Sequence, residues 1–270
     1  MKKIKVGIIG CGTIGSEIAK ACLRELAGTI TLVGICDIDK TKAEALVGIL
    51  AKPVPILSSD DLIRAADLVT EAASAKISGD ILEKCVNKNK DILVMSVGGL
   101  LGKEKLLKYA EEKGVKVYLP SGAICGIDGL KAASAGEVDS VTLTTRKPLK
   151  GLEGAPYLRE KNIDIGSISG ETVVFEGSAE EAVKGFPQNI NVSAVLALAG
   201  IGSAETRVRI VTSPDYTKNI HEVEITGDFG RITTRTENVP SKANPKTSML
   251  AILSAIATLR AAATSVRIGT

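Results

Sequence analysis

Three glycines near the start of the chain have the spacing that places a phosphate group against a peptide backbone. The turn reads Gly-Cys-Gly-Thr-Ile-Gly and lies between an apolar, β-branched run over residues 4–9 and an amphipathic pattern over residues 16–27. In such a unit Gly10 permits the tight turn, Gly12 lets the backbone approach a pyrophosphate, and Gly15 lets the helix pack on its strand. N–H groups at the start of the helix bind the phosphates. The sequence therefore predicts a dinucleotide site, and its candidate residues are Gly10, Gly12, Thr13, Ile14 and Gly15.

An acidic residue follows the second expected strand at a distance that suits a ribose. Residues 30–36 form an apolar run that ends at Asp37, about 20 residues after Gly15. There a carboxylate accepts hydrogen bonds from the adenosine ribose and repels a 2′-phosphate, which favours NAD over NADP. Lys40 and Lys42 could soften that preference, so the cofactor is NAD or NADP. The alternative is a structural glycine turn in which Asp37 only caps a loop.

The only histidine of the chain is His221, in an alternating segment over residues 219–226. An imidazole titrates near neutrality and is the usual general acid or base. An enzyme that moves a hydride from a carbon bearing OH or NH₂ must also handle a proton, so His221 is the candidate catalytic residue. The alternative is a histidine that is exposed, or buried with its hydrogen bonds satisfied.

Two polar stretches are candidates for substrate or cofactor contacts. Asn189 and Asn191 lie in a turn before a helix and could bond a carboxamide or a carboxylate; their alternative role is capping. Arg146 and Lys147 end a strand and suit a dicarboxylate through charge-assisted hydrogen bonds. Their alternative is a solvated strand end.

Cys125 lies in a glycine-rich loop, where some aldehyde dehydrogenases carry a cysteine nucleophile. No Cys-x-Thr run follows it, and a small buried thiol is the commoner fate of a cysteine. The five cysteines are scattered and form no C-x-x-C pair, so we expect neither a disulfide framework nor a metal site.

Strands and helices alternate from residue 4 to about residue 119, which is typical of a parallel sheet built from βαβ units. Ligands of such sheets bind beyond the carboxyl ends of the strands. This rule adds Ala73, the end of the expected strand over residues 67–73, to the cofactor-binding candidates. We therefore expect an α/β fold that begins with a Rossmann dinucleotide-binding domain over residues 1–120.

The pattern changes beyond Pro120. A glycine-rich stretch is followed by strand-like segments with few helices between them, which predicts an α+β catalytic or dimerisation domain over residues 121–243 with a mixed or antiparallel sheet. The expected strands cover residues 140–146, 171–176, 205–212, 219–226 and 231–238.

An apolar helix over about residues 245–262 closes the chain, with Asn244 as its expected N-cap and Pro245 as its first residue. A helix that is apolar around most of its circumference needs a buried place. We expect it to pack back on the first domain, so that residues 244–270 belong with residues 1–120.

Bulk composition argues against several classes of function. The net charge is +3, no basic block carries interleaved aromatic residues, and aromatic residues make up 3% of the chain, so a nucleic-acid partner is not expected. No signal segment and no membrane-length apolar run is present, which predicts a cytoplasmic protein without a membrane partner.

Five motifs together resemble the L-aspartate dehydrogenase family over essentially the whole chain. They are GIIGCGTIG, SGAICGIDG, FPQNINVSAVLALAG, NIHEVEITGDFG and NPKTS. The resemblance implies an NAD(P)-dependent enzyme, commonly a homodimer, that oxidises L-aspartate to iminoaspartate, or to oxaloacetate and ammonia after hydrolysis. It also implies a product that feeds NAD biosynthesis through quinolinate, with a possible hand-off to quinolinate synthase. By motif, the active-site histidine falls on His221 and nicotinamide-contacting positions fall on Ala123 and Asn189.

Two other functions fit the same architecture. An aspartate-semialdehyde-type dehydrogenase would use Cys125 as its nucleophile and tolerate the loss of His221. A non-catalytic redox sensor would bind NADH tightly without turnover.

Overall fold

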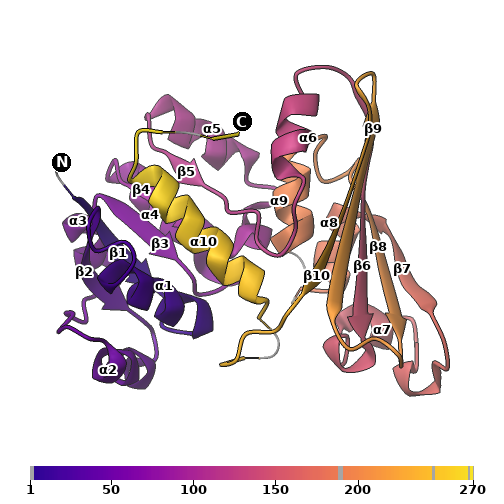
Figure 1. Cartoon of the computed structure of the whole chain (residues 1–270), viewed down its shortest axis with the longest axis horizontal. Coiled ribbons are helices and arrows are strands. Elements are labelled where there is room, and N and C mark those ends of the chain that lie inside the picture. Colours follow the sequence, from indigo (N-terminus) through magenta and orange to yellow (C-terminus); the bar gives the residue numbers. More distant parts are fainter. Residues whose placement is uncertain (1–2, 188–190, 245–246, 267, 270) are drawn as a thin grey trace. The chain divides into compact units, whose positions relative to one another are not determined.

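The computed structural model describes residues 3–187, 191–244, 247–266 and 268–269. The chain divides into two compact units, each built on one five-stranded sheet (Figure 1). Unit 1 comprises Met1–Pro120 with Ile252–Arg267, and unit 2 comprises Ser121–Ala251 with Ile268–Thr270.

The sheet of unit 1 is wholly parallel, with the strand order β2-β1-β3-β4-β5. Its strands are short apolar runs, as expected where helices cover both faces of a sheet. The predicted parallel sheet with alternating helices is confirmed. The elements of this unit are β1 (Ile4–Ile9), α1 (Thr13–Leu23), β2 (Ile30–Cys36), α2 (Lys40–Ile49), α3 (Ser59–Ala65), β3 (Leu68–Glu71), α4 (Ala75–Asn87), β4 (Asp91–Val94), the 3₁₀ turn η1 (Val97–Leu100), α5 (Glu104–Glu112), β5 (Val117–Tyr118) and most of α10 (Met249–Ala262).

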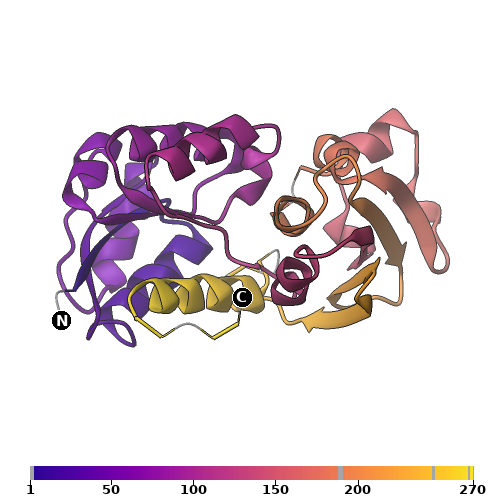
Figure 2. The ribbon, with the colours of Figure 1, turned by 90° about the horizontal axis from the view of Figure 1, so that it is seen from above.

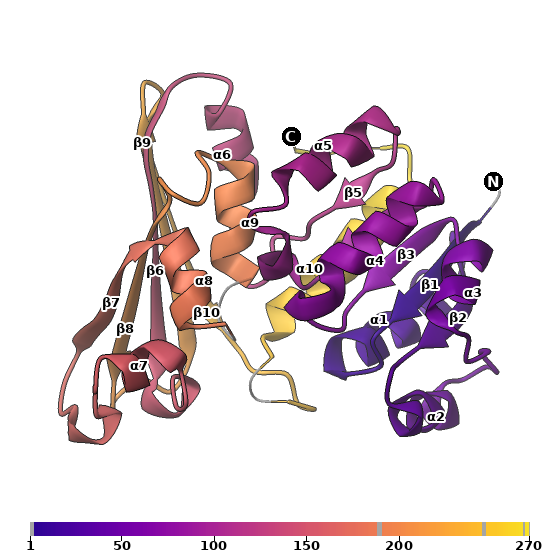
Figure 3. The same cartoon turned by 180° about the vertical axis from the view of Figure 1, so that it is seen from behind.

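The last helix, α10, packs on this sheet as the sequence predicts. Figures 1 and 2 show α1 and α10 on one face, and Figure 3 shows α3 and α4 on the other. Val6 and Ile8 of β1 share a core with Ile18 of α1 and with Ala255 and Leu259 of α10. The apolar helix is therefore buried against the strand that leads into the glycine turn.

Two helix boundaries differ from the prediction. α1 begins at Thr13, three residues early, because Gly12 serves as its N-cap, and it ends at Leu23 because the chain leaves helical geometry at Arg24. α10 begins at Met249, where the Leu250 N–H donates to the Ser248 hydroxyl (3.2 Å), so the predicted Asn244 cap is wrong. The predicted first residue, Pro245, lies outside the described residues.

The sheet of unit 2 is mixed, with the order β10-β9-β6-β8-β7 and one parallel pair, β6 with β8, among its described strands. All five predicted strands are present, with ends that differ by at most two residues, so the predicted mixed sheet is confirmed. The elements are α6 (Ile127–Ala133), β6 (Val138–Pro148), η2 (Leu149–Gly151), α7 (Pro156–Glu160), η3 (Ile165–Ser167), β7 (Thr172–Ser178), α8 (Ala179–Gly185), α9 (Asn191–Ala199), β8 (Arg207–Ser213), β9 (Asn219–Gly227) and β10 (Gly230–Asn238).

The two faces of this sheet differ in chemistry. Helices α6, α8 and α9 lie against one face, where Leu143 and Ile225 are buried (Figures 1 and 3). The other face carries ion pairs: Arg146 with Glu222, Arg231 with Glu224, and Arg209 with Glu176. Because successive side chains alternate between faces along a regular strand, the same strands supply both the helix-covered core and the charged surface.

Among the described residues, no helix has both the length and the apolar character needed to cross a bilayer. The same part of the chain holds no cluster of three or more histidine, cysteine or acidic side chains arranged for a metal ion. Its five cysteines are free thiols.

Candidate functional site

The glycine turn of unit 1 has one position that is open and two that are closed to any side chain. A Cβ on Gly15 would lie 1.8 Å from the Gly10 carbonyl oxygen. Gly10 has φ +103°, and a Cβ there would lie 2.5 Å from the Ala72 carbonyl group. At Gly12, by contrast, a Cβ would meet no protein atom within 4 Å. The closed positions shape the turn, and the open one leaves the space that a pyrophosphate needs beside the N-terminus of α1.

The structure brings the predicted residue Ala73 to the same turn. The ideal Cβ position of Gly10 lies 2.7 Å from the Ala73 nitrogen, so the loop after β3 passes directly beside the glycine turn. Thr13 and Ile14 form the first turn of α1 at this edge. The carboxyl ends of β1 and β3 thus gather the predicted cofactor-binding residues, and this arrangement fits a dinucleotide.

Asp37 is tied to this turn by its own hydrogen bonds. Its Oδ2 accepts from the Cys11 N–H (2.7 Å) and its Oδ1 accepts from the Asp39 N–H (2.9 Å). Asp37 therefore has the structural role, capping a loop, that the sequence offers as the alternative. Each carboxylate oxygen has a second lone pair, so the same group can also accept from ribose hydroxyls. The ribose contact itself stays a prediction.

We expect Asp37→Ser to change cofactor selectivity. Removing the carboxylate removes its repulsion of a 2′-phosphate, so the ratio of kcat/KM for NADP to that for NAD should rise about tenfold or more. Steady-state kinetics with each cofactor measures this ratio. Asp39→Ser is the control, because Asp39 caps α2 by accepting from the Thr41 N–H (3.0 Å) and serine preserves a cap. Equal ratios in the two variants would contradict the role of Asp37.

In unit 2, His221 is buried in the helix-covered face of the sheet. It stands on β9 directly opposite Thr145 of β6, and its Nδ1 lies 3.0 Å from the Thr145 hydroxyl oxygen. This bond fixes the ring and leaves Nε2 as the other nitrogen for proton transfer. Burial and the positive charge of Lys147 lower the pKa of His221 to about 3, so the ring is neutral at neutral pH.

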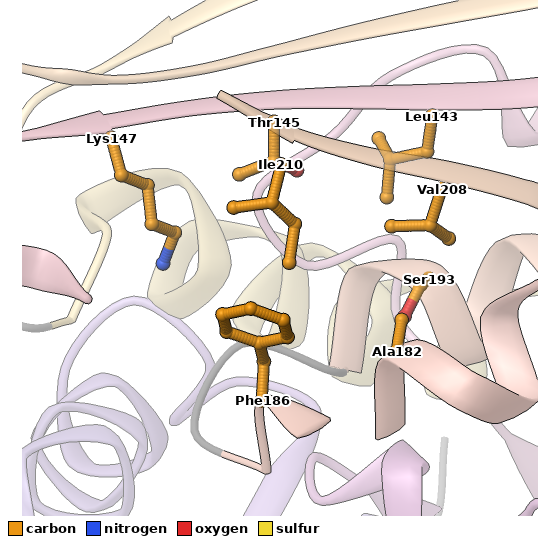
Figure 4. Close-up of a pocket in the computed structure, with 8 residues that line it drawn as sticks. All are labelled: Leu143, Thr145, Lys147, Ala182, Phe186, Ser193, Val208 and Ile210. Atoms are coloured by element: carbon orange, nitrogen blue, oxygen red, sulfur yellow. The ribbon is translucent and has the colours of Figure 1, made fainter. Parts of the chain in front are cut away.

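Lys147 faces the same side of the sheet, two residues beyond Thr145. Its side chain is 9% exposed, and burial lowers its pKa to about 8. Figure 4 shows Lys147, Thr145 and Ile210 extending from the strands toward Phe186 around a small cavity, with a volume of about 10 Å³. That volume is about what one water molecule needs, so a larger ligand at Lys147 requires neighbouring side chains to move.

Arg146, the neighbour of Lys147, lies on the opposite face. Its guanidinium pairs with Glu222 and lies 3.8 Å from the Glu171 carboxylate. The structure therefore separates the two cations that the sequence grouped together, and it brings only Lys147 close to His221. Arg146 belongs to the surface ion pairs.

The loop that carries Ala123 is attached to β10. The Ala123 carbonyl accepts from the Thr236 hydroxyl (3.1 Å) and from the Asn238 amide (3.0 Å), and Thr236 pairs with His221 in the β9–β10 register. Ala123 and the His221 strand are thus joined through β10. Sequence reasoning assigned no role to Thr145, Thr236 or Asn238, because their contacts depend on strand register.

Three sequence candidates remain: Asn191, Asn189 and Cys125. Asn191 is exposed and is the first residue of α9. Asn189 lies outside the described residues. Cys125 is exposed, and its carbonyl accepts from the Thr234 hydroxyl (3.2 Å).

The low pKa of His221 has a consequence for acid stability. An unfolded chain takes up a proton on this ring near pH 6.5, whereas the folded chain does so only near pH 3. Between these values the unfolded state binds more protons, so the free energy of unfolding should fall as the pH is lowered through this window. We expect His221→Gln to lose part of this slope in urea titrations at pH 7, 5 and 4. Equal slopes in the two proteins would show that the ring is already charged in the folded state.

Two family models match consecutive parts of the chain. Residues 10–120 match the family model described as homoserine dehydrogenase, NAD binding domain, and residues 128–262 match the model described as aspartate dehydrogenase, C-terminal. The L-aspartate dehydrogenases of Methanosarcina barkeri and Methanococcoides burtonii are 44% and 45% identical to this chain, over 99% of it and 100% of each relative.

A solved structure agrees as well. The aspartate dehydrogenase of Thermotoga maritima superposes with a TM-score of 0.74 at 26% identity, covering 99% of this chain and 100% of that one. With matches of this extent in both sequence and structure, the chain belongs to the L-aspartate dehydrogenase family.

Proposed function

We propose that this chain catalyses the NAD(P)-dependent oxidation of L-aspartate to iminoaspartate, which hydrolyses to oxaloacetate and ammonia. The observation that carries this proposal is the buried His221, held by Thr145 beside Lys147, in a chain whose other unit has an open glycine turn. The named relatives support the choice of substrate. They give no support to the semialdehyde reaction through Cys125.

In this proposal Gly10, Gly12 and Gly15 form the turn that receives the pyrophosphate, and Asp37 faces the ribose. The nicotinamide of NAD or NADP, when bound, supplies the two-electron acceptor for the hydride. The chain's own residues must then bind the amino acid and handle the proton.

His221 is the proposed proton carrier. Its neutral ring accepts at Nε2 the proton that the α-ammonium group of L-aspartate must lose before the hydride leaves, and returns it to the amine in the reverse direction. When the imine is hydrolysed, the same nitrogen takes a proton from the water that adds. Thr145 keeps the ring in one orientation through Nδ1. A ring that is neutral at neutral pH is ready to act as a base without first losing a proton.

Lys147 is the proposed partner of a substrate carboxylate. An ammonium group in apolar surroundings attracts a carboxylate more strongly than an exposed one does. The arriving carboxylate also offsets the positive charge that depresses the pKa of His221. Substrate binding would in this way raise the basicity of His221 toward the range useful for proton transfer.

Removal of this cation should act mainly on substrate binding. We expect Lys147→Met to raise the KM for L-aspartate about 10- to 100-fold, the loss expected for a hydrogen bond to a charged group. The KM for NAD should be unchanged. Arg146→Met, on the opposite face of the same strand, is the control and should leave both values near those of the wild type. A similar rise in both variants would indicate a general effect of strand charge.

A substrate panel tests the proposed reaction. Purified protein with NAD or NADP is offered L-aspartate, D-aspartate, L-malate, or L-aspartate semialdehyde with phosphate, and formation of the reduced cofactor is followed by absorbance. Reduction of the cofactor with L-aspartate, and with none of the other three substrates, supports the proposal. Reduction with L-malate or with the semialdehyde in place of L-aspartate would overturn it.

We further propose that the enzyme acts in the cytoplasm as a homodimer and supplies iminoaspartate for NAD biosynthesis. The free thiols of the described residues suit a reducing compartment, and the family resemblance supports the rest. Light scattering on the eluting peak of a sizing column tests the dimer. Conversion of iminoaspartate by added quinolinate synthase with its three-carbon co-substrate, measured as quinolinate formed per NAD reduced, tests the hand-off.

A further inference from the structure

Glu71 is a completely buried carboxylate at the carboxyl end of β3, the central strand of unit 1. Its Oε1 accepts from the N–H groups of Ala73 (2.8 Å) and Ser74 (3.1 Å) and from the Ser96 hydroxyl (2.9 Å). Its Oε2 accepts from the Ser96 N–H (3.0 Å). One side chain therefore joins the loop after β3 to the loop after β4.

These two loops lie at the edge where a dinucleotide is expected. The loop after β3 contacts the glycine turn, since a Cβ on Gly10 would lie 2.5 Å from Ala72 and 2.7 Å from Ala73. The loop after β4 is fixed in turn by the Ser78 hydroxyl, which donates to the Ser96 carbonyl (3.0 Å). A change at Glu71 would thus move backbone that lies against Gly10 of the glycine turn.

Burying this charge is costly, which indicates that holding the two loops in place serves more than the stability of the fold. Burial raises the pKa of Glu71 above its ordinary value, and the hydrogen bonds act in the opposite direction. At the amino ends of β3 and β4, carboxylates that are less buried also bind backbone N–H groups of neighbouring segments. Asp67 accepts from the Lys5 N–H (2.9 Å), and Asp91 accepts from the Lys116 N–H (2.9 Å). The carboxylate that is fully removed from water stands at the ligand-binding edge.

We propose that Glu71 is a positioning residue for the dinucleotide: its carboxylate holds the loops after β3 and β4 in the arrangement that binds the cofactor. This inference rests on the proposed binding of NAD or NADP along this edge. It assigns a function to a residue that makes no contact with substrate.

Glu71→Gln is the direct test, because the two side chains have the same shape. With the amide oxygen at the Oε1 position, the amide NH₂ faces the Ser96 N–H, so two donors oppose each other and the loop after β4 is released. We expect the Kd of NADH, measured by fluorescence titration of the whole protein without substrate, to rise about tenfold. Asp67→Asn and Asp91→Asn also lose a carboxylate that binds a backbone N–H, and they should keep the wild-type Kd.

The outcomes separate this inference from the proposed function. If the wild type binds NADH and Glu71→Gln binds it equally well, or if all three variants lose affinity alike, the positioning role is overturned. If the wild type does not bind NADH, the proposed function fails instead. Should Glu71→Gln not fold, Ser96→Ala removes only the hydroxyl donor to Oε1. A rise in its Kd supports the role, and an unchanged Kd overturns it.

Discussion

Replacing His221 with alanine is expected to lower kcat for L-aspartate oxidation by about 10²- to 10⁴-fold, the usual contribution of general acid–base catalysis. The reason is that the variant lacks the buried imidazole whose Nε2 is proposed to carry the proton. The Kd of NADH should stay within about twofold of the wild type, because the glycine turn belongs to the other unit. Steady-state kinetics and fluorescence titration on the same preparation give both values.

Thr145→Val provides a graded companion to this variant. It keeps the imidazole but removes the hydroxyl at Nδ1, so we expect a smaller loss of kcat than in His221→Ala. Because both substitutions alter the buried face of the sheet, circular dichroism must show that each variant is folded. Full activity in a folded His221→Ala protein would show that His221 has no part in the mechanism. It would favour the alternative reaction with Cys125 as nucleophile.

The second large effect is expected in the glycine turn, where two variants distinguish a loss of cofactor affinity from a loss of stability. Gly12→Ala places its methyl group where no protein atom lies within 4 Å, so no clash opposes folding. The free energy of unfolding should fall by at most about 1 kcal/mol, because alanine is a poorer N-cap than glycine. The methyl group occupies space that the pyrophosphate needs, and we expect the Kd of NADH to rise about 10- to 100-fold, as for overpacking of 1–3 kcal/mol. Urea titration and NADH titration measure the two quantities.

Gly15→Ala should behave differently, because its Cβ would lie 1.8 Å from the Gly10 carbonyl oxygen. The backbone has to shift, so this variant should lose about 1–3 kcal/mol of stability as well as affinity. A Gly12→Ala protein with wild-type affinity for NADH would mean that the cofactor does not approach the turn at that residue.

Local sequence signals were sufficient for the architecture. The strands of unit 1 are short apolar runs separated by amphipathic helices, and the strands of unit 2 alternate in polarity, so both sheets follow from periodicity. The glycine turn is equally predictable, because its glycine spacing lies between a strand and a helix, and Gly10 and Gly15 stand where the backbone leaves no room for a Cβ. Residues 149–168 carry no clear periodicity, so their short helical turns are not predicted from the sequence.

The chemistry around His221 could be predicted only in part. His221 itself follows from being the only histidine, but its partner Thr145 is 76 residues away and is brought opposite by the register of β6 and β9. Register also decides that Lys147 lies on the buried face and that Arg146 lies on the opposite face, paired with Glu222, although the two residues are adjacent in sequence. The alternation of a strand places the two on opposite faces, but a one-residue slip would exchange them, so the sequence alone does not decide which of the two is buried.

Oxidation of NADH in the presence of oxaloacetate, with and without ammonium, tests the central assignment most directly. We expect oxidation that requires ammonium, yields L-aspartate, and is lost in His221→Ala. Oxidation that proceeds equally well without ammonium would identify a hydroxy-acid dehydrogenase. No oxidation under either condition, by a protein that binds NADH, would contradict the assignment to L-aspartate oxidation.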